Sequence, residues 1–244
     1  MEIKLSKTGH EEIRSFRIIF LQENNFQFIH NKCYDYGWAD CWLFTVDDEK
    51  AGYGSIWGSE KREDRDAIFE FYLTTPFRKM ANLFFEELIQ VSGAILIECQ
   101  SNDHLLSSML FEYAKDINAE AILFEDHFQT DLYIPEIIFR REPTDDPNPN
   151  NMGGYVLEQY GQKVASGGFM LNYNIPYADI YMEVNENFRH KGFGSLIVQE
   201  LKKEIYLMGR VPSARCSINN KISKGTLLKA GFKVCGAILK GSIK

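Results

Sequence analysis

The same order of sequence elements occurs twice in this 244-residue chain, and this repetition restricts the possible folds more than any other feature. In each half, a turn between two strand-like runs (47–58 and 159–170) precedes a strand that leads to Phe-Arg. A helical stretch and a further strand follow, and the halves close on related runs, AEAILF and CGAILK. A shared order of this kind favours two copies of one α/β fold over a chance likeness.

A polar segment separates the two halves. Residues 140–154 read RREPTDDPNPNNMGG, so Pro, Asp, Asn and Gly largely replace apolar residues there. Such a composition is typical of a linker. The sequence therefore predicts a first domain over 1–140, a linker over 141–154 and a second domain over 155–244.

The strongest local motif lies in the second half, between a strand and a helix. Tyr177–Val184 is short and rich in aromatic and branched residues, which predicts a strand. Apolar residues recur at helical spacing over 196–208, and Gly209 stands where a helix would end. Between them lies RHKGFGS, Arg189–Ser195, whose glycines permit a tight turn and whose amides can converge on an anion beside basic side chains. The interpretation is a diphosphate-binding turn, and the alternative is an ordinary strand-to-helix turn with solvated basic residues.

A second motif follows this turn. NNKISKGTLLKAGF, Asn219–Phe232, comes after a predicted strand and ends in Lys-Ala-Gly-Phe. The two motifs in this order resemble the GNAT N-acetyltransferase superfamily, in which an Arg/Gln-x-x-Gly-x-Gly/Ala turn holds the pyrophosphate of acetyl-CoA. The resemblance covers mainly 156–239. It implies an α/β (α+β) protein of two tandem GNAT-like domains, each a mixed, mostly antiparallel central sheet flanked by helices.

The resemblance also implies acetyl-CoA as co-substrate and assigns residues to it. The strand before the turn would hydrogen-bond the pantetheine arm along Met182 and Val184. Asn220 would approach the cofactor from the end of the next strand. The turn would surround the pyrophosphate with Arg189, His190, Lys191, Gly192, Phe193, Gly194 and Ser195.

Acetyl transfer to an amine requires a group that accepts the amine proton. Asp179, Tyr181 and Glu183 alternate with apolar residues, so they share one face of the predicted strand. The candidate catalytic residues are Glu183, which is nearest the turn, and then Asp179; the alternative is that these carboxylates are solvated or ion-paired. Many members of the family carry a Tyr general acid where this chain has Leu227, so water or another Tyr would have to serve.

The two copies differ at the turn. In the first half, Arg78 is followed by Lys-Met-Ala-Asn, which is shorter than the second turn and contains no glycine. Side chains at Met80 and Asn82 should crowd the space that a pyrophosphate needs. The first copy is therefore expected to be degenerate and to pack against, or shape the substrate cleft of, the second. The second copy also has little room before Tyr155 for the opening helices of a complete family fold.

The composition of the chain limits the classes of binding partner and the compartment that are expected. The net charge of −7 argues against general nucleic-acid binding and favours cationic partners. No apolar run approaches a membrane span, and the N-terminal residues lack the layout of a signal peptide. Cysteines without zinc spacing predict reduced thiols in the cytoplasm and no metal site. These cysteines are Cys33, Cys41, Cys99, Cys216 and Cys235.

Together these features predict an N-acetyltransferase that moves an acetyl group from acetyl-CoA to a primary amine of a small cationic acceptor. The competing class is a catalytically silent CoA-binding or regulatory module, which the Leu227 substitution favours. An interaction protein without cofactor is a third class. The expected partner is a small-molecule amine, with no nucleic acid and no membrane, and the sequence leaves monomer and homodimer open.

Overall fold

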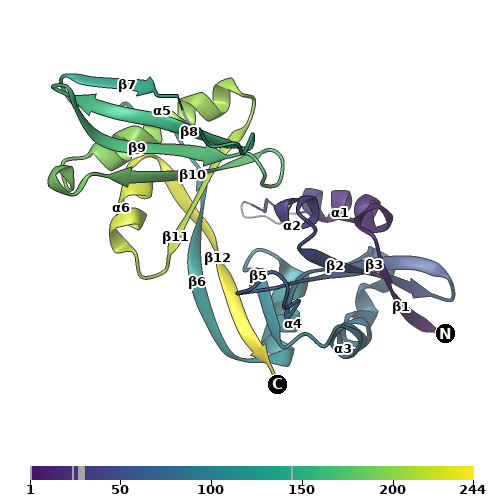
Figure 1. Cartoon of the computed structure of the whole chain (residues 1–244). Coiled ribbons are helices and arrows are strands. Elements are labelled where there is room, and N and C mark those ends of the chain that lie inside the picture. Colours follow the sequence, from purple (N-terminus) through teal and green to yellow (C-terminus); the bar gives the residue numbers. More distant parts are fainter. Residues whose placement is uncertain (1, 24, 27–30, 144) are drawn as a thin grey trace. The chain divides into compact units, whose positions relative to one another are not determined.

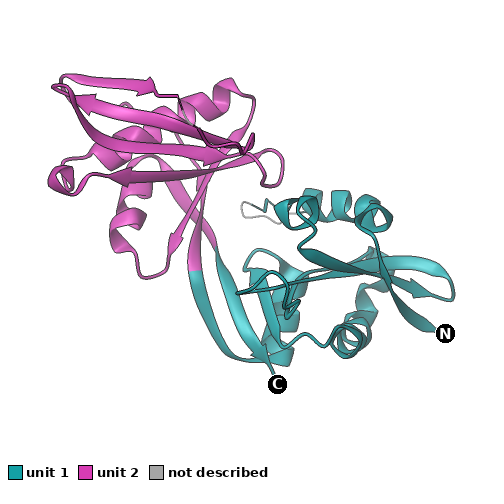
Figure 2. Cartoon of the chain, viewed as in Figure 1, with its two compact units in different colours: residues 1–26, 30–120, 237–244 teal, residues 27–29, 121–236 magenta. Residues whose placement is uncertain are grey.

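The computed structural model describes residues 2–23, 25–26, 31–143 and 145–244. They form two compact units (Figure 2). The first unit comprises residues 1–26, 30–120 and 237–244, and the second is built from residues 121–236. The units thus divide the chain elsewhere than predicted, because 121–140 belong to the second unit and 237–244 belong to the first.

The first unit is a mixed sheet with flanking helices (Figure 1). Its elements in chain order are β1 (Ile3–Thr8), α1 (His10–Glu23), α2 (Asn31–Asp35), β2 (Ala39–Val46), β3 (Glu49–Trp57), β4 (Ala67–Leu73), η1 (Thr75–Met80), α3 (Ala81–Ser92), β5 (Leu96–Gln100), α4 (His104–Tyr113), the first part of β6 (Ala114–Asp126) and the last part of β12 (Phe232–Ile243). Strands β1 to β4 pair antiparallel with their sequence neighbours, and β5 joins β4 in parallel.

Helices cover both faces of this sheet. On one face, Phe84 and Leu88 of α3 pack into a core with Phe44 and Phe71. On the other face, α1 packs against Tyr53. Because successive side chains of a strand point to opposite faces, a strand covered on both sides is apolar throughout. This accounts for the complete burial of β4.

A buried ion pair fixes α1 to β4. The guanidinium of Arg17 lies 3.0 Å from the carboxylate of Glu70, and both side chains are almost fully buried. The hydroxyls of Tyr34 and Tyr53 also donate to Glu70, at 2.7 and 2.8 Å. Burial, with the charge of Glu70, raises the pKa of Tyr53 well above its usual range. Protein side chains therefore occupy the space between α1 and β4 in this unit.

The second unit repeats the sheet order of the first but opens without helices. Its elements are the second part of β6, β7 (Ile137–Arg141), β8 (Asn151–Gln159), β9 (Gln162–Met170), β10 (Tyr177–Val184), η2 (Glu186–Phe188), α5 (Phe193–Leu207), β11 (Val211–Ser217), α6 (Lys221–Lys229) and the first part of β12. Strands β7 to β10 pair antiparallel, and β10 pairs in parallel with β11. The fold class that the resemblance implied, a mixed and mostly antiparallel α/β sheet in each half, is confirmed.

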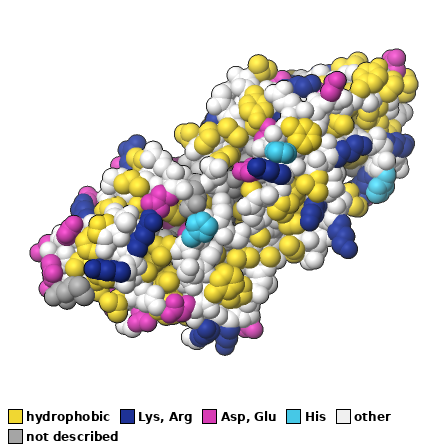
Figure 3. Space-filling model, turned by 180° about the vertical axis from the view of Figure 1, so that it is seen from behind, with side chains coloured by type: hydrophobic (Ala, Val, Ile, Leu, Met, Phe, Trp, Pro, Cys, Tyr) yellow, Lys and Arg dark blue, Asp and Glu magenta, His cyan; other side chains and the backbone are white. Residues whose placement is uncertain are grey.

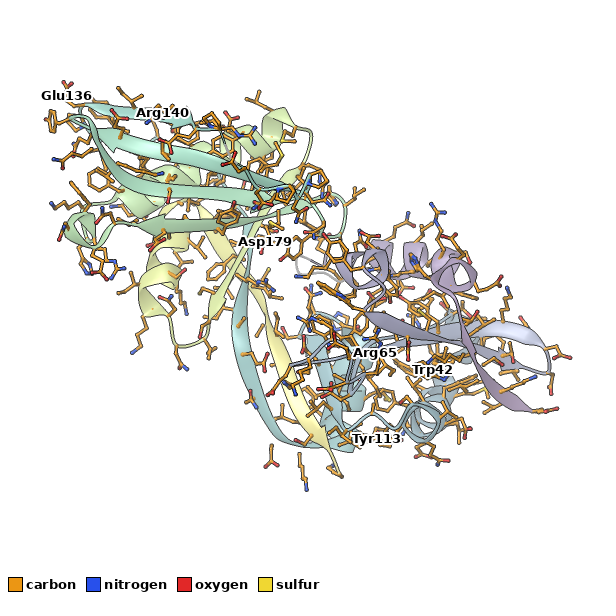
Figure 4. All side chains as sticks on the ribbon, viewed as in Figure 1. Trp42, Arg65, Tyr113, Glu136, Arg140 and Asp179 are labelled. Carbon is orange, nitrogen blue, oxygen red and sulfur yellow. The ribbon has the colours of Figure 1, made fainter. Side chains whose placement is uncertain are left out.

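The predicted linker lies inside the second unit. Strands β7 and β8 pair from Ile137↔Gln159 to Arg141↔Tyr155, so residues 142–150 connect neighbouring strands of one sheet. Arg140 of β7 (Figure 4) forms ion pairs with Glu142 and Glu158, both at 2.9 Å. Loops between paired strands and linkers between domains share the same Pro, Asn, Asp and Gly content, which explains the difference from the prediction.

Two strands, β6 and β12, each have residues in both units. The second part of β6 runs antiparallel to β11 within the second unit, and the pairing extends to Ala121 opposite Ser217. Residues Ile238–Ser242 of β12 pair antiparallel with β5 within the first unit. The sheet of the first unit is therefore completed by a strand that lies more than 100 residues later in the chain than the rest of the unit.

The surface drawn in Figure 3 carries a mixture of side chains. Lys and Arg lie among acidic and hydrophobic residues, so neither sign of charge forms a continuous field on this face. Within the described ranges, no helix combines the length and the apolar character that a membrane span needs.

Candidate functional site

A pocket of about 630 Å³ opens in the second unit where β10 ends and where α5 and α6 begin. The predicted site residues that line it are Met182, Glu183, Val184, Arg189, His190, Gly192, Phe193, Gly194, Ser195 and Asn220. Predicted residues Asp179 and Lys191 are not among its lining. Sequence reasoning missed the wall formed by α6 and the last residue of η2, which comprises Phe188, Lys221, Ile222, Ser223, Gly225, Thr226 and Lys229.

The two glycines of the turn have different physical roles. Gly192 adopts φ 90° directly before α5, a conformation that side-chain-bearing residues rarely adopt. Gly194 lies inside the first turn of α5, where a Cβ would come within 3.1 Å of Thr226 Cγ2 and 3.4 Å of Val184 Cγ2. Gly192 thus permits the change of chain direction, and Gly194 permits the close approach of α5 to its neighbours.

The first amides of α5 are unengaged. A helix leaves its first N–H groups without partners inside the helix, and Gly192 at the N-cap position offers no side chain to satisfy them. Among the residues that the structure describes, the amides of Phe193, Gly194 and Ser195 have no hydrogen-bond acceptor. These N–H groups and the positive end of the helix dipole can therefore bind an anion.

Basic side chains surround these amides. Arg189 lines the pocket, donates from Nε to the Val184 carbonyl at 3.4 Å and pairs with Glu186 at 3.4 Å. Lys229 Nζ lies 3.8 Å from the position that a Cβ of Gly192 would take. The Lys191 ammonium instead donates to the Asn187 carbonyl at 3.3 Å. The positive charge of the pocket therefore comes from both the turn and α6.

Two polar side chains fix the helices that border the pocket. Asn220 caps α6, since its Oδ1 accepts from the Ser223 amide at 2.9 Å. The Ser195 hydroxyl donates to the Thr226 carbonyl at 3.0 Å and so joins α5 to α6. The Ser195 side chain is therefore engaged with the protein, while its backbone amide remains available.

The structure separates the two candidate carboxylates. Glu183 lines the main pocket with an exposed side chain and also borders two smaller hollows, of about 330 and 420 Å³. Asp179 (Figure 4) lies at the other end of β10, and its Oδ2 is 3.6 Å from Arg215 Nε. Tyr181 lies between them and donates to Asn151 Oδ1 at 2.6 Å. The alternation of these residues along β10 is as predicted, but Glu183 is the carboxylate at the pocket.

The first unit has the same local framework without the anion-binding turn. Arg78 Nε donates to the Leu73 carbonyl at 3.1 Å, as Arg189 does to Val184. Here, however, the amide of Ala81 at the start of α3 is hydrogen-bonded to the Arg78 carbonyl. The side chain of Met80 packs into the core, and the Arg78 guanidinium pairs with Glu23 of α1 at 2.5 Å. The Ala81 amide and the Arg78 guanidinium are thus engaged by the protein itself.

Asp103 caps the start of α4 in the first unit, as Asn220 caps the start of α6 in the second. Its Oδ1 accepts from the Leu106 amide at 3.0 Å. Burial raises the pKa of this carboxyl to about 7, with the charge of Glu70 adding to the rise. Since its ordinary value is 3.8, the folded protein binds the proton more tightly than the unfolded chain. The contribution of Asp103 to stability is therefore lost as pH rises from about 4 to 7.

Replacing Asp103 with Asn is expected to remove this pH dependence. Asn is as good an N-cap as Asp, but it buries no charge. We expect a higher Tm than that of the wild type at pH 8 and little difference near pH 4. Tryptophan fluorescence measures the melting of the first unit, because Trp38, Trp42 and Trp57 all lie in it. Parallel pH profiles for the two proteins would contradict the assignment.

Among the residues described, no group of three His, Cys, Asp or Glu side chains could hold a metal ion. All five cysteines are free, and burial raises the pKa of four of their thiols to between about 11 and 12. A thiol with so high a pKa is a poor nucleophile at neutral pH. These are Cys33, Cys41, Cys99 and Cys235.

Comparisons with known proteins agree with this fold. A family model described as an acetyltransferase (GNAT) domain matches residues 11–127, and one described as FR47-like protein matches 176–238. No curated protein sequence matches the chain. The fold and site define a class, that of α/β proteins with two acetyltransferase-like units in tandem. The model that matches residues 11–127 is that of a GNAT acetyltransferase domain, the family that the two motifs of the second half resemble.

Solved structures share this arrangement over the whole chain. A GNAT-family acetyltransferase from Colwellia psychrerythraea is 14% identical, with a TM-score of 0.78 and complete coverage of both chains. A tandem GNAT protein from the clavulanic acid biosynthesis pathway, solved without AcCoA, is 9% identical, with a TM-score of 0.65 and coverage of 99% of this chain and 98% of that one. A GCN5-related N-acetyltransferase from Sphaerobacter thermophilus is 12% identical, with a TM-score of 0.62 and coverage of 99% and 96%. At these identities the likeness establishes the fold.

Proposed function

We propose that the second unit transfers an acetyl group from acetyl-CoA to a primary amine of a small cationic acceptor. The observation that carries this proposal is the set of unengaged amides at Phe193, Gly194 and Ser195, which open into a pocket beside Arg189 and Lys229. A diphosphate needs such converging donors and positive charge. In the first unit the Ala81 amide is engaged and Arg78 pairs with Glu23, so we expect one cofactor per chain.

The residues around the pocket would have different roles in the proposed reaction. The turn and Asn220 would hold the pyrophosphate end of acetyl-CoA, and Met182 and Val184 of β10 would hold its arm. The cofactor supplies the acetyl thioester. Glu183 would accept the proton from the acceptor ammonium, which frees the nitrogen lone pair for attack on the thioester carbonyl. Leu227 is buried and has no ionisable proton, so water or another Tyr would have to protonate the departing thiolate.

Replacing Gly192 with Ala tests the cofactor site. Alanine at φ 90° is strained, so the turn should change its conformation and the amides should point elsewhere. We expect the affinity for acetyl-CoA, measured by isothermal titration calorimetry, to fall roughly tenfold to a hundredfold, because hydrogen bonds to charged groups contribute about 1.5–3 kcal/mol.

Gly209→Ala is the matched control. Gly209 follows the other end of α5 with φ 70°, and a Cβ there would meet no atom within 4 Å. Both variants should lose roughly 1–2 kcal/mol of stability from backbone strain, but only Gly192→Ala should lose affinity for acetyl-CoA. Equal affinity in the two variants would rule out the turn as the cofactor site.

The second candidate function is a CoA-binding module without catalysis. It is favoured by Leu227, a buried apolar residue where many relatives carry a general acid. Release of free thiol from acetyl-CoA in the presence of a panel of primary amines distinguishes the two functions. Binding without release across cationic, neutral and acidic amines would favour the module. The free cysteines and the use of acetyl-CoA make the cytoplasm the expected compartment.

A further inference from the structure

A segment without helix or strand, residues 127–134, lies against α5 and the end of α6 in the second unit; we call it the strap. Its first amides, those of His127 and Phe128, both donate to the Gly231 carbonyl at 3.1 Å. A Cβ at Gly231 would lie 2.2 Å from the Phe128 carbonyl oxygen, so only glycine allows this approach. The strap is therefore closely packed where it begins.

One buried amide side chain of α5 holds the middle of the strap. Gln199 is 4% exposed, and its Oε1 accepts from Thr130 Oγ1 and from the Leu132 amide, both at 2.7 Å. Its Nε2 donates to the Leu132 carbonyl at 3.2 Å. Because both edges of the Gln199 amide are used, the strap has one fixed register along α5.

A buried lysine one turn further along α5 holds the start of the strap. Lys202 is 3% exposed and donates to the Phe128 carbonyl at 2.8 Å and to the Ala230 carbonyl at 2.9 Å. It also pairs with Asp126 at 2.5 Å. This ammonium thus joins the strap to the end of α6, the helix that forms one wall of the pocket.

The strap ends at the anion-binding turn. Ile134 Cδ1 lies 3.6 Å from the position that a Cβ of Gly192 would take, and Lys229 Nζ lies 3.8 Å from the same point. The turn itself holds two left-handed residues, His190 at φ 64° and Gly192 at φ 90°. A left-handed conformation in His190 costs free energy, so this turn persists only when its surroundings fix it.

We propose that Gln199 is a positioning residue for the cofactor. Its side chain holds the strap so that Ile134 supports the Gly192 turn in its anion-binding conformation. The inference rests on the proposed function, because the ligand that the turn binds is the diphosphate of acetyl-CoA. Donors that are held in place before binding pay less entropy when the ligand arrives. Releasing the strap should therefore weaken cofactor binding although Gln199 touches no ligand.

The test compares Gln199→Met, Ile134→Ala and the wild type, with Gly209→Ala as the control for lost stability. Met fills a similar volume but forms none of the hydrogen bonds to the strap, and Ile134→Ala keeps those bonds but removes the support. Titration calorimetry gives Kd for acetyl-CoA, amide hydrogen exchange at Leu132 reports release of the strap, and steady-state kinetics separate KM from kcat.

We expect Gln199→Met to speed exchange at Leu132 and to raise Kd roughly tenfold, within the range known for residues that act without ligand contact. Ile134→Ala should raise Kd in the same direction, and kcat at saturating acetyl-CoA should stay unchanged in both. Fast exchange at Leu132 with a wild-type Kd would overturn the positioning role while leaving the proposed function intact. If Gln199→Met does not fold, Ile134→Ala alone tests the proposal. A wild-type Kd for acetyl-CoA in Ile134→Ala would likewise overturn the positioning role. A wild type that binds no acetyl-CoA would overturn the proposed function and this inference with it.

Discussion

Glu183→Gln is expected to lower kcat/KM for acetyl transfer by at least about 10²-fold, the usual contribution of a positioned general base. The Gln side chain keeps the size of Glu183 but cannot accept the ammonium proton. Glu183 is exposed at the edge of the pocket, next to the β10 residues proposed to hold the cofactor arm. The loss should appear in kcat, measured as release of free thiol, and the Kd for acetyl-CoA should stay close to that of the wild type.

Asp179→Asn serves as the matched control on the same strand. Asp179 is paired with Arg215 and does not line the pocket. Its amide variant should therefore change the rate only slightly. A large loss of kcat in Asp179→Asn with a small one in Glu183→Gln would transfer the role of base to Asp179.

Deleting residues 237–244 is expected to unfold the first unit, although almost all of that unit lies more than 100 residues earlier in the chain. Ile238–Ser242 pair with β5, and Ile238 is buried. Leu239 and Ile243 pack against the core of the first unit. The deletion removes this strand and uncovers an edge of the sheet, a loss comparable to the 5–15 kcal/mol by which whole domains are stable.

Tryptophan fluorescence is the appropriate measurement, because all three tryptophans lie in the first unit. The truncated protein should show a red-shifted emission and no cooperative melting of this signal. Removal of Lys244 alone is the control, since it removes only a terminal residue that bonds to the Tyr113 and Glu112 carbonyls. Native emission and normal melting after removal of 237–244 would show that β12 is dispensable.

The same pairing limits how the role of the first domain can be tested. A fragment that contains only residues 145–244 lacks β6, the antiparallel neighbour of β11. Loss of activity in such a fragment would follow from unfolding alone. Point substitutions in the first unit of the intact chain, such as that at Asp103, avoid this difficulty.

Local chemistry made the candidate site readable from the sequence. The predicted strand Tyr177–Val184 coincides with β10, and the predicted turn and helix appear as the Gly192 turn and α5. Glycine conformation, helical periodicity and strand alternation depend on residues close in the chain. The difference between the two turns was readable for the same reason, because the absence of glycine after Arg78 is a local fact.

Only the tertiary structure decided which distant segments meet. The pairing of β6 with β11 and of β12 with β5, the hydrogen bonds of Gln199 to the strap, and the ion pair of Asp179 with Arg215 all join residues far apart in sequence. The alternation of side chains along a strand does not specify which strand it pairs with. The sequence likewise does not show which groups a buried Gln will hydrogen-bond. The sequence by itself thus determined the glycine turn and the repeated fold, because both depend on residues close in the chain, whereas long-range packing determined the unit boundaries and the pairing of Asp179 away from the pocket.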